Sequence, residues 1–471
     1  MTRFLQTAMH AFMLSAAHKS SGKTSVSIGL CAALASRGMA VQPFKKGPDY
    51  IDPMWHARAA GRPCYNLDPY LASAGEICRA WRQRAAGADV CLVEGNMGLH
   101  DGLALDGSNS NAALAAMLDL PVILVIDARG MTRGIAPLVL GYQAFDPNIR
   151  IAGVILNRIA GQRHESKLRA ALDHYTTIPV LGAIPETPEL AIDERHLGLV
   201  PSSEADDAAE RIDRLRQAVA AHVDIERLLA LTASAASAPA PIAPLRRKAD
   251  LRIGIARDAA FGFYYAEDLD ALRDAGAELV PFDTLRDQHL PAVDGLFIGG
   301  GFPEVMAAEL AANVTLRAEL CRAIEGGLPV YAECGGLMYL SRSITWQGQT
   351  HAMVGAIPAD AVMQRKAAGR GYVDIEATAD HPWLPVGAAI RAHEFHYSTL
   401  INAAPGLRHA WRVQRGHGID GRQDGIVHHN MLAAYSHLRS LPGCEWPTRF
   451  VAFVRQCAAA KHAAEPLAAC A

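Results

Sequence analysis

The feature that most constrains the fold is an alternation of short apolar runs with longer stretches of helix-like composition, which occurs twice along the chain. In the first half, the predicted strands are Ala11–Ser15, Val41–Phe44, Val90–Val93, Val122–Ile126, Ile151–Leu156 and Val180–Ala183. The predicted helices between them are Ser25–Ser36, Ala74–Ala86, Asn111–Leu118, Ile135–Phe145 and Arg163–His174. Strands that alternate with helices in this way predict an α/β domain whose mostly parallel sheet is flanked by helices on both faces.

The same pattern restarts in the second half, after a stretch that is rich in alanine, serine and proline. The predicted elements there are strands at Leu251–Ala256, Leu279–Phe282, Gly295–Ile298 and Pro329–Ala332, and helices at Ala266–Ala275 and Leu316–Glu325. Beyond Ser343 the chain is richer in strand-like segments. A length of 471 residues suits two or three domains of roughly 150 residues each. We therefore predict two successive α/β domains, 1–232 and 249–471, joined by a semi-rigid linker over 233–248.

Charge balance and hydropathy exclude some classes of function. Lys and Arg together number 45 against 48 Asp and Glu, a formal net charge of −3, whereas proteins that coat nucleic acid or anionic membranes favour a basic surface. No apolar run approaches the roughly 18 residues of a membrane span. The apolar start at Phe4–Ala17 is interrupted by His10 and leads into the loop described next, so we do not interpret it as a signal peptide. The nine cysteines include no Cys-x-x-Cys pair, which indicates reduced thiols in a cytoplasmic protein. The charge balance and the lack of a membrane span predict that it binds neither nucleic acid nor membrane.

Residues 17–24, with the sequence AHKSSGKT, predict a phosphate-binding loop. The motif Gly-x-x-x-x-Gly-Lys-Ser/Thr requires a preceding strand and a following helix, because backbone N–H groups at a helix N-terminus hold phosphate. Both flanks are present here, although Ala17 replaces the first glycine of the motif. Lys23 would reach the β- and γ-phosphates, and the Thr24 hydroxyl would bind Mg²⁺. The loop residues expected to bind ATP are Ser20, Ser21, Gly22, Lys23 and Thr24.

Acidic residues follow the strands that come after this loop. Asp49 and Asp52 lie beyond the second predicted strand, and Glu94 and Asp101 lie beyond the third. Ligands of open α/β sheets bind at the carboxyl ends of the strands, and Mg²⁺ prefers oxygen ligands. Taken alone, each carboxylate is more typical of a turn or a helix cap. Together with a phosphate loop, they favour a site for Mg²⁺ and a nucleotide.

A second chemical site is predicted around Cys334, which follows an apolar strand and opens a helix in the sequence ECGGL. Small residues permit the sharp turn that exposes a nucleophile, and a helix N-terminus favours a thiolate. The loop Gly299–Glu304 follows another strand, and the backbone N–H groups of Gly300 and Gly301 would form an oxyanion hole. A general base is also needed. The candidates in the histidine-rich C-terminal region are His393, His396, His428, His429 and His437.

Several motifs together carry a family resemblance. The segment around Cys334, with Gly299–Glu304 ahead of it, resembles the class I glutamine amidotransferase domain, and the first half of the chain resembles the dethiobiotin-synthetase-like ATP domain. Three further segments are GPDYIDP at 47–53, VEGNMGLHDG at 93–102 and HEFHYS at 393–398. With these, the fusion resembles the cobyrinic acid a,c-diamide synthase family over nearly the whole chain.

The resemblance implies roles for individual residues. Cys334 matches the glutaminase nucleophile and His437 the histidine that activates it. Arg439 stands where many class I amidotransferases have a glutamate, so the third member of the triad stays unassigned. Asn157 matches an adenine-contacting position. The remaining matches are Thr24, Asp49 and Glu94 around the metal, and Asp49, Tyr50, Asp52 and Asp101 around the substrate or acyl phosphate.

The implied reaction uses ATP, Mg²⁺ and L-glutamine to amidate the a and c side-chain carboxylates of a corrinoid, through an acyl phosphate, in cobalamin biosynthesis. Hydrogenobyrinic acid and a nickel-sirohydrochlorin are alternative substrates that the residues do not separate. The sibling cobyric acid synthase shares both domain types, but the 47–53 and 93–102 motifs favour the diamide synthase. An alternative from a different class is a partitioning-type ATPase, because Lys19 resembles the signature lysine of those proteins. Cys334 and His437 would then have no role. A homodimer is one oligomeric state that the resemblance allows.

Overall fold

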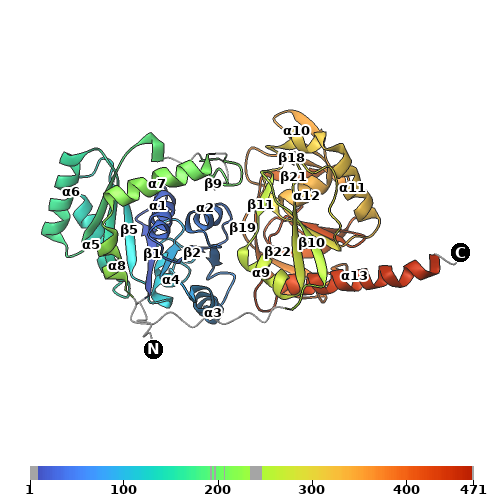
Figure 1. Ribbon diagram of the computed structural model, residues 1–471, viewed down its shortest axis with the longest axis horizontal. Coiled ribbons are helices and arrows are strands. Elements are labelled where there is room, and N and C mark those ends of the chain that lie inside the picture. The colour runs from blue at the N-terminus through green and yellow to red at the C-terminus, as the bar shows by residue number, and fades with distance from the viewer. Residues whose placement is uncertain (1–8, 191–193, 196–197, 206, 234–246, 469–471) are drawn as a thin grey trace. The chain divides into compact units, whose positions relative to one another are not determined.

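A computed structural model describes residues 9–190, 194–195, 198–205, 207–233 and 247–468. The chain divides into two compact units, 1–243 and 244–471, and each unit is built around its own sheet (Figure 1). Each sheet is flanked by helices, which confirms the predicted α/β class. Most of the linker predicted at 233–248 lies outside the described residues.

The sheet of the first unit has the strand order β3-β2-β4-β1-β5-β6-β7, and its neighbouring strands run parallel. These strands are β1 His10–Ala16, β2 Val41–Lys46, β3 Tyr65–Leu67, β4 Val90–Glu94, β5 Val122–Asp127, β6 Ile151–Ile159 and β7 Val180–Pro185. Nearly every residue of the strands is buried, as expected when helices cover both faces of a parallel sheet. The first strand lies in the middle of the sheet, so the loop that follows it is surrounded by the ends of β4, β5 and β6.

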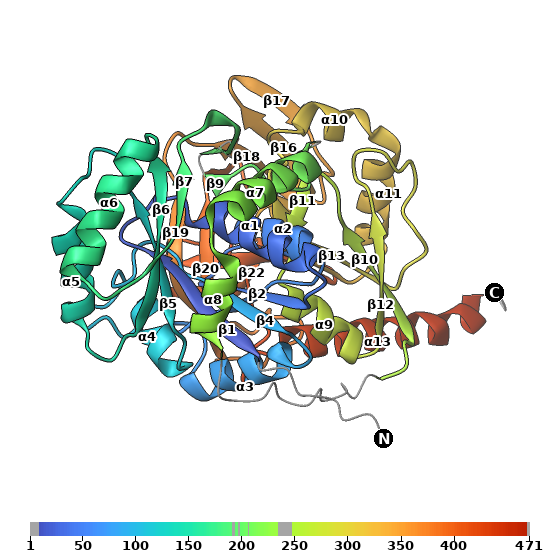
Figure 2. The same ribbon diagram turned by 60° about the vertical axis from the view of Figure 1, so that its left-hand side comes forward.

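The helices of this unit include all those predicted and three more. The predicted ones are α1 Lys23–Ser36, α3 Ala74–Ala85, α4 Asn111–Met117, α5 Ile135–Phe145 and α6 Gln162–Tyr175. The additional ones are α2 Ile51–Ala60, α7 Ala208–His222 and α8 Ile225–Thr232. Gly29 lets α1 and α7 approach closely (Figure 2), because a Cβ at this position would lie 2.7 Å from the Leu215 carbonyl oxygen. A short helix at Pro188–Leu190 and the strand pair β8 Glu194–Arg195 and β9 Gly198–Leu199 complete the described elements.

The main sheet of the second unit has the order β12-β10-β13-β15-β24-β23-β22-β19-β20. Neighbours from β12 to β24 run parallel, as predicted, and those from β24 to β20 run antiparallel. The parallel strands are β10 Leu251–Ala256, β12 Ala277–Phe282, β13 Gly295–Ile298, β15 Val330–Glu333 and β24 Met431–Ala434. The antiparallel ones are β19 Gly369–Ala377, β20 Ala389–His396, β22 Arg408–Arg415 and β23 Gln423–His428. They account for the strand-rich composition predicted beyond Ser343.

Two smaller sheets lie beside the main one. One is four-stranded, in the order β17-β16-β18-β21, with β16 Ser341–Trp346, β17 Gln349–Ala352, β18 Ile357–Met363 and β21 Ser398–Ile401. The other pairs β11 Phe261–Phe263 with β14 Gly300–Gly301 in antiparallel orientation. This pairing places the predicted glycine loop against a neighbouring strand.

Helices cover both faces of the main sheet (Figure 1). They are α9 Ala266–Asp274, α10 Ala307–Ala312, α11 Val314–Glu325, α12 Gly335–Leu340 and α13 Trp446–Ala468. Leu296 and Val330 belong to the hydrophobic cluster that includes α11 and α12, whereas their chain neighbours Phe297 and Tyr331 belong to the cluster that includes Trp446 of α13. Successive residues of each strand therefore enter two different cores, as the two-residue period of a strand requires.

In the part of the chain that the structure describes, no helix combines the length and the apolar character needed to cross a bilayer.

Candidate active sites

The predicted phosphate loop joins the central strand β1 to helix α1. Ser20 and Gly22 both have positive φ, +64° and +85°, in the left-handed region that glycine adopts most readily. A Cβ at Gly22 would lie 2.2 Å from the Asn157 Nδ2 atom, so a side chain is also excluded sterically. Ala17 is not among the positive-φ residues. The alanine that replaces the first glycine of the motif is therefore accommodated without backbone strain.

The end of strand β6 supports this loop. Asn157 donates from Nδ2 to the Ser21 carbonyl oxygen at 2.9 Å, and Arg158 donates to the Ser20 carbonyl oxygen at 2.8 Å. Arg158 also pairs with Asp127 at 2.7 Å, which fixes its guanidinium group. The Asn157 side chain thus acts on the loop backbone. Its contact with adenine stays a prediction.

Three oxygen-bearing side chains converge at the start of α1. Thr24 donates from Oγ1 to Glu94 Oε1 at 2.9 Å and to Asp52 Oδ2 at 3.3 Å. The Lys45 ammonium donates to the same two carboxylate oxygens, at 2.8 Å and 2.5 Å. A positive group therefore already lies where a hydroxyl and two carboxylates meet. A hydroxyl and two carboxylates are suitable ligands for Mg²⁺.

The charges in this cluster shift one another. Burial alone would raise the pKa of Glu94, but Lys45 and His56 hold it well below its usual range. Burial and the neighbouring Asp49 raise the pKa of Asp52 to about 7. Burial alone would lower the pKa of Lys45, but its carboxylate neighbours hold it well above the usual value. The cluster therefore keeps Glu94 ionised and leaves Asp52 able to take up a proton near neutral pH.

Lys23 extends from the loop toward the 93–102 segment. Its ammonium donates to the Met97 carbonyl oxygen at 2.6 Å. Burial lowers its pKa to about 8, so the side chain is mostly protonated at neutral pH and able to contact an anion.

The other predicted residues of this unit have local structural contacts. Asp49 Oδ1 accepts from the backbone N–H groups of Ile51 and Asp52, at 2.9 Å and 3.2 Å, and so caps α2. Tyr50 is buried at the start of that helix. Asp101 is exposed, and its Oδ2 accepts from the Gly98 N–H at 2.9 Å, which closes a turn. The structure therefore brings Asp52 and Glu94 to Thr24 and places Asp49 Oδ2 3.6 Å from Lys45 Nζ, whereas the functional roles of Asp49, Tyr50 and Asp101 stay predictions.

Two basic residues that sequence reasoning missed complete this cluster. Lys45 links Asp52 to Glu94, as described above, and His56 Nε2 lies 2.5 Å from Glu94 Oε2. A charged residue at the buried end of an apolar strand was the available signal for Lys45, since lysine is rarely buried without a partner.

In the second unit, Cys334 lies on a sharp turn between β15 and α12. Its φ of +48° and ψ of −101° are unusual for a residue with a side chain, and such strain is typical of a nucleophile elbow. The turn lies against the glycine loop, because a Cβ at Gly335 would lie 3.0 Å from the Gly301 nitrogen. A Cβ at Gly336 would lie 2.3 Å from the Ile298 carbonyl oxygen. The two glycines after Cys334 are thus required by close backbone approach.

His437 is the histidine that the structure places beside Cys334. The two side chains are hydrogen-bonded, and His437 Nδ1 lies 3.1 Å from Glu333 Oε2. Burial would lower the pKa of His437, but the hydrogen bonds to Cys334 and Glu333 raise it to about 10. Glu333 Oε1 also accepts from the Leu438 N–H at 2.9 Å, which fixes the carboxylate. Cysteine, histidine and carboxylate therefore form a continuous hydrogen-bonded row.

Sequence reasoning missed Glu333 because the family pattern places the glutamate after the histidine. Here that position is Arg439, which donates to Glu267 at 2.6 Å. The carboxylate instead comes from the residue directly before the nucleophile. A glutamate that ends the apolar strand before Cys334 was the signal that could have found it.

The other candidate bases have different places. His393 stacks on His437, with ring centroids 4.8 Å apart, and His396 stacks on Tyr435 at 3.8 Å. His428 and His429 lie in the turn that precedes β24. In the pairing of β15 with β24, the start of β15 at Val330 lies beside Met431, and its end at Glu333 lies beside Ala434. Cys334 follows the opposite end of these strands, which places it roughly 10 Å away along the strand direction. The register therefore excludes His428 and His429 as the base for Cys334.

Comparisons with known proteins define the class first. A family model described as the CobQ/CobB/MinD/ParA nucleotide binding domain matches residues 15–200, and one described as the CobB/CobQ-like glutamine amidotransferase domain matches residues 252–442. The chain is thus a nucleotide-binding domain fused to a glutamine amidotransferase domain, in agreement with both sites.

The family follows from whole-chain relatives. A protein of Magnetococcus marinus named cobyrinate a,c-diamide synthase is 46% identical over 94% of this chain and 97% of its own length. Proteins of the same name from Methanosarcina acetivorans and Listeria monocytogenes are 41% and 38% identical, each over 91% of this chain, and are covered over 92% and 96% of their lengths. The chain belongs to the cobyrinate a,c-diamide synthase family.

Proposed function

We propose that this protein amidates the a and c side-chain carboxylates of cobyrinic acid, with ammonia taken from glutamine and with ATP as the activating reagent. The family membership supports this substrate. The observation that carries the chemistry is the hydrogen-bonded row of Cys334, His437 and Glu333 in a chain that also holds a phosphate loop with buried carboxylates.

The second unit supplies the ammonia. The Cys334 sulfur attacks the side-chain amide carbon of glutamine, and His437 passes a proton to the leaving nitrogen. Ammonia departs and leaves a thioester, which water hydrolyses to glutamate and the free thiol. The backbone N–H groups of Gly300 and Gly301, together with that of Gly335, are proposed to stabilise the tetrahedral oxyanion. Glu333 holds the His437 ring in orientation and stabilises its protonated form, the role that a carboxylate has in a catalytic triad.

The first unit activates the substrate. A corrinoid carboxylate oxygen attacks the γ-phosphorus of ATP, which releases ADP and forms an acyl phosphate. Ammonia then attacks the acyl carbon, forms the amide and displaces inorganic phosphate. Lys23 and the N–H groups of Ser21, Gly22 and Thr24 would hold the phosphates in line with this carboxylate. Thr24, Glu94 and Asp52 would hold Mg²⁺, which neutralises charge on the phosphates when it is bound. Asp49, Tyr50 and Asp101 are proposed to contact the substrate.

The choice of tetrapyrrole is tested by mass spectrometry of products. Cobyrinic acid, hydrogenobyrinic acid and a nickel-sirohydrochlorin are each incubated with the enzyme, ATP, Mg²⁺ and glutamine. We expect the doubly amidated product from cobyrinic acid at the highest kcat/KM. A preference for the metal-free or the nickel substrate would replace cobyrinic acid in this proposal and leave the two-site chemistry in place.

Substitution His437→Ala is expected to lower glutamine-dependent turnover on the order of 10²-fold or more, the usual range for loss of a general acid–base group. Turnover with free ammonia should stay near that of the wild type, because this histidine serves only the glutaminase. Variants His428→Ala and His429→Ala are matched controls at the other end of the strands. Glutamine use that survives His437→Ala and is lost in a control would show that the base is misassigned.

The role of Glu333 predicts a change in pH dependence. His437 has a pKa raised to about 10 partly by this carboxylate, so its protonated form persists to alkaline pH. Substitution Glu333→Gln removes the charge, keeps the shape and should lower that pKa. The alkaline limb of the kcat/KM profile for glutamine should then move to lower pH, while the ammonia profile stays in place. An unshifted alkaline limb would contradict the role of Glu333.

A further inference from the structure

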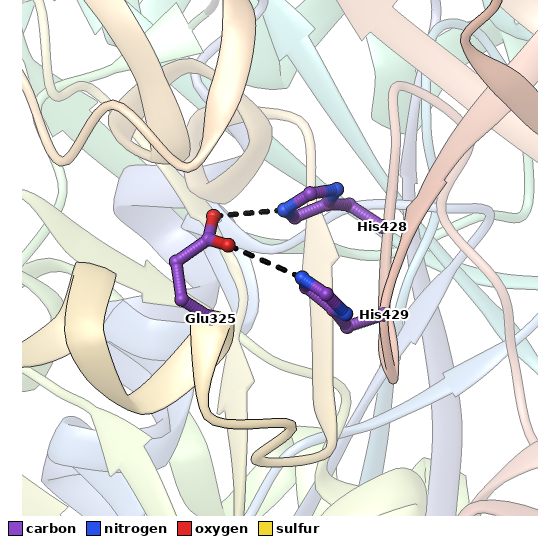
Figure 3. A group of neighbouring side chains, drawn as sticks. All are labelled: Glu325, His428 and His429. Carbon is purple, nitrogen blue, oxygen red and sulfur yellow. Dashed lines mark hydrogen bonds and ion pairs between the residues drawn. The ribbon is translucent and has the colours of Figure 1, made fainter.

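A cluster of three side chains lies in the second unit, at the other end of the parallel strands from Cys334. It consists of Glu325, His428 and His429 (Figure 3). His428 Nε2 lies 2.8 Å from Glu325 Oε1, and His429 Nε2 lies 3.1 Å from Glu325 Oε2. One nitrogen of each ring and one carboxylate oxygen all fall within 4.8 Å of one another. The glutaminase chemistry uses none of these residues.

The backbone of the turn between β23 and β24 brings both rings to the same side. Consecutive residues of an extended strand direct their side chains to opposite faces. His429 instead has a φ of +49°, in the left-handed region, which histidine adopts more readily than most residues with a side chain. Figure 3 shows that both rings consequently point toward Glu325. The ring centroids are 4.3 Å apart.

The charge of Glu325 favours a cation at this place. Glu325 is the last residue of α11, and a negative side chain at a helix C-terminus is disfavoured by the helix dipole. Each of its two carboxylate oxygens faces one imidazole nitrogen, at 2.8 Å for His428 and 3.1 Å for His429. The side chains of His428 and His429 are 32% and 46% exposed. An ion from solvent can therefore reach the ligand atoms directly.

We propose that Glu325, His428 and His429 form a binding site for a divalent transition metal ion, with Zn²⁺ as the representative ion. Zinc binds histidine nitrogen and carboxylate oxygen at about 2.0–2.2 Å, which places two ligands of a tetrahedral ion about 3.4 Å apart. The observed separations of 2.8 Å and 3.1 Å join the two rings to different oxygens of Glu325. One ligand atom from each residue lies within 4.8 Å of the others, so the side chains would need to shift by roughly 1 Å to surround one ion. Two imidazoles with one carboxylate suit zinc, copper or nickel rather than Mg²⁺. A proton on either Nε2 atom would be released to solvent or carried on Nδ1 instead, which leaves the Nε2 lone pair for the ion.

The neighbouring Cys321 is not part of the site. It lies one helical turn before Glu325 on α11. Burial and the Glu325 charge raise the pKa of its thiol, whereas a metal-binding cysteine must be a thiolate. Cys321→Ala is therefore a matched control that alters a close neighbour without removing a ligand.

The proposal is tested by zinc titration of the full-length protein after dialysis against a chelator, in the absence of Mg²⁺ and nucleotide. Zinc uptake is measured by competition with a chromophoric chelator. Each of the variants His428→Ala, His429→Ala and Glu325→Gln should lower the zinc affinity of this site roughly tenfold or more. Loss of a residue that only orients a metal ligand already lowers affinity by this factor. Cys321→Ala should bind as the wild type does. Zinc should also raise the unfolding temperature of the wild type and of Cys321→Ala, and not that of the three ligand variants.

Because a thiol and an imidazole also attract Zn²⁺, Cys334→Ala is titrated in parallel. Loss of the zinc site in Cys334→Ala, with the three ligand variants unchanged, would place the ion at the glutaminase site and overturn the proposal. Absence of zinc uptake by the wild type would show that the cluster is an ion pair only, and it would overturn the proposal equally. Circular dichroism of the ligand variants, all of which change exposed or half-exposed residues, verifies that they fold.

Discussion

Substitution Cys334→Ser is expected to reduce glutamine-dependent amidation on the order of 10⁴-fold or more, while amidation with free ammonia stays near the wild-type rate. Removal of the nucleophile has cost on this order in other enzymes that use covalent catalysis. A serine hydroxyl has a far higher pKa than a thiol, so the hydrogen bond from His437 would not yield a comparable nucleophile. The ammonia reaction needs only the first unit, which the substitution leaves intact.

The measurement compares both nitrogen sources on the same preparation. Cys334 is buried, and serine is close enough to cysteine in volume to fit at the same position. A normal rate with ammonia also shows that the variant is folded. Cys321→Ser, on α11, is the matched control and should keep both rates. Glutamine-dependent amidation that persists in Cys334→Ser would exclude this cysteine as the nucleophile.

The double substitution Lys23→Ala and Thr24→Ala is expected to lower amidation on the order of 10³-fold or more with either nitrogen source. Lys23 supplies a charge to the phosphates, and removal of one such charge in phosphoryl-transfer enzymes costs about 10³- to 10⁵-fold. Thr24 donates to both Glu94 and Asp52, so its loss also disturbs the carboxylates proposed to hold Mg²⁺. Both nitrogen sources require the acyl phosphate, so neither should rescue the variant.

Hydrolysis of glutamine in the absence of the corrinoid separates this effect from general misfolding. The double variant should retain basal glutaminase activity, because Cys334, His437 and Glu333 belong to the other unit. The variant Lys19→Ala, whose side chain lies in the same loop, serves as a control for the loop itself and should be far less affected. Ammonia-dependent turnover at the wild-type rate in the double variant would contradict the ATP site.

The strands and the phosphate loop could be predicted because their signals are local. Apolar runs of strand length and a Gly-Lys-Thr sequence at a strand end are visible in any short window. Helix α2 was not predicted, because Gly47 and Pro48 indicate a turn and Pro53 falls inside the helix. The structure shows that Asp49 caps the helix and that Pro53 lies in its first turn, where a missing N–H leaves no hydrogen bond unmade.

The contacts that complete the sites could not be predicted, because they join residues far apart in the chain. Glu333 and His437 are 104 positions apart, and only the pairing of β15 with β24 brings them together. The same pairing separates His428 and His429 from Cys334. Lys45 likewise meets Glu94 across 49 positions, through the pairing of β2 with β4. Spacing within the sequence identifies residue types suited to the chemistry, whereas sheet register determines which of them meet.

The central claim is that one chain activates a carboxylate with ATP and amidates it with nitrogen released at Cys334. The most direct test is a double isotope experiment with amide-¹⁵N glutamine and cobyrinic acid whose carboxylates carry ¹⁸O. We expect ¹⁵N in both new amides and one ¹⁸O in the inorganic phosphate released with each, because the acyl phosphate bridges the carboxylate oxygen to phosphorus. Amide product without ¹⁵N would contradict glutamine as the nitrogen source. Release of AMP and pyrophosphate, with no ¹⁸O in inorganic phosphate, would contradict the acyl phosphate.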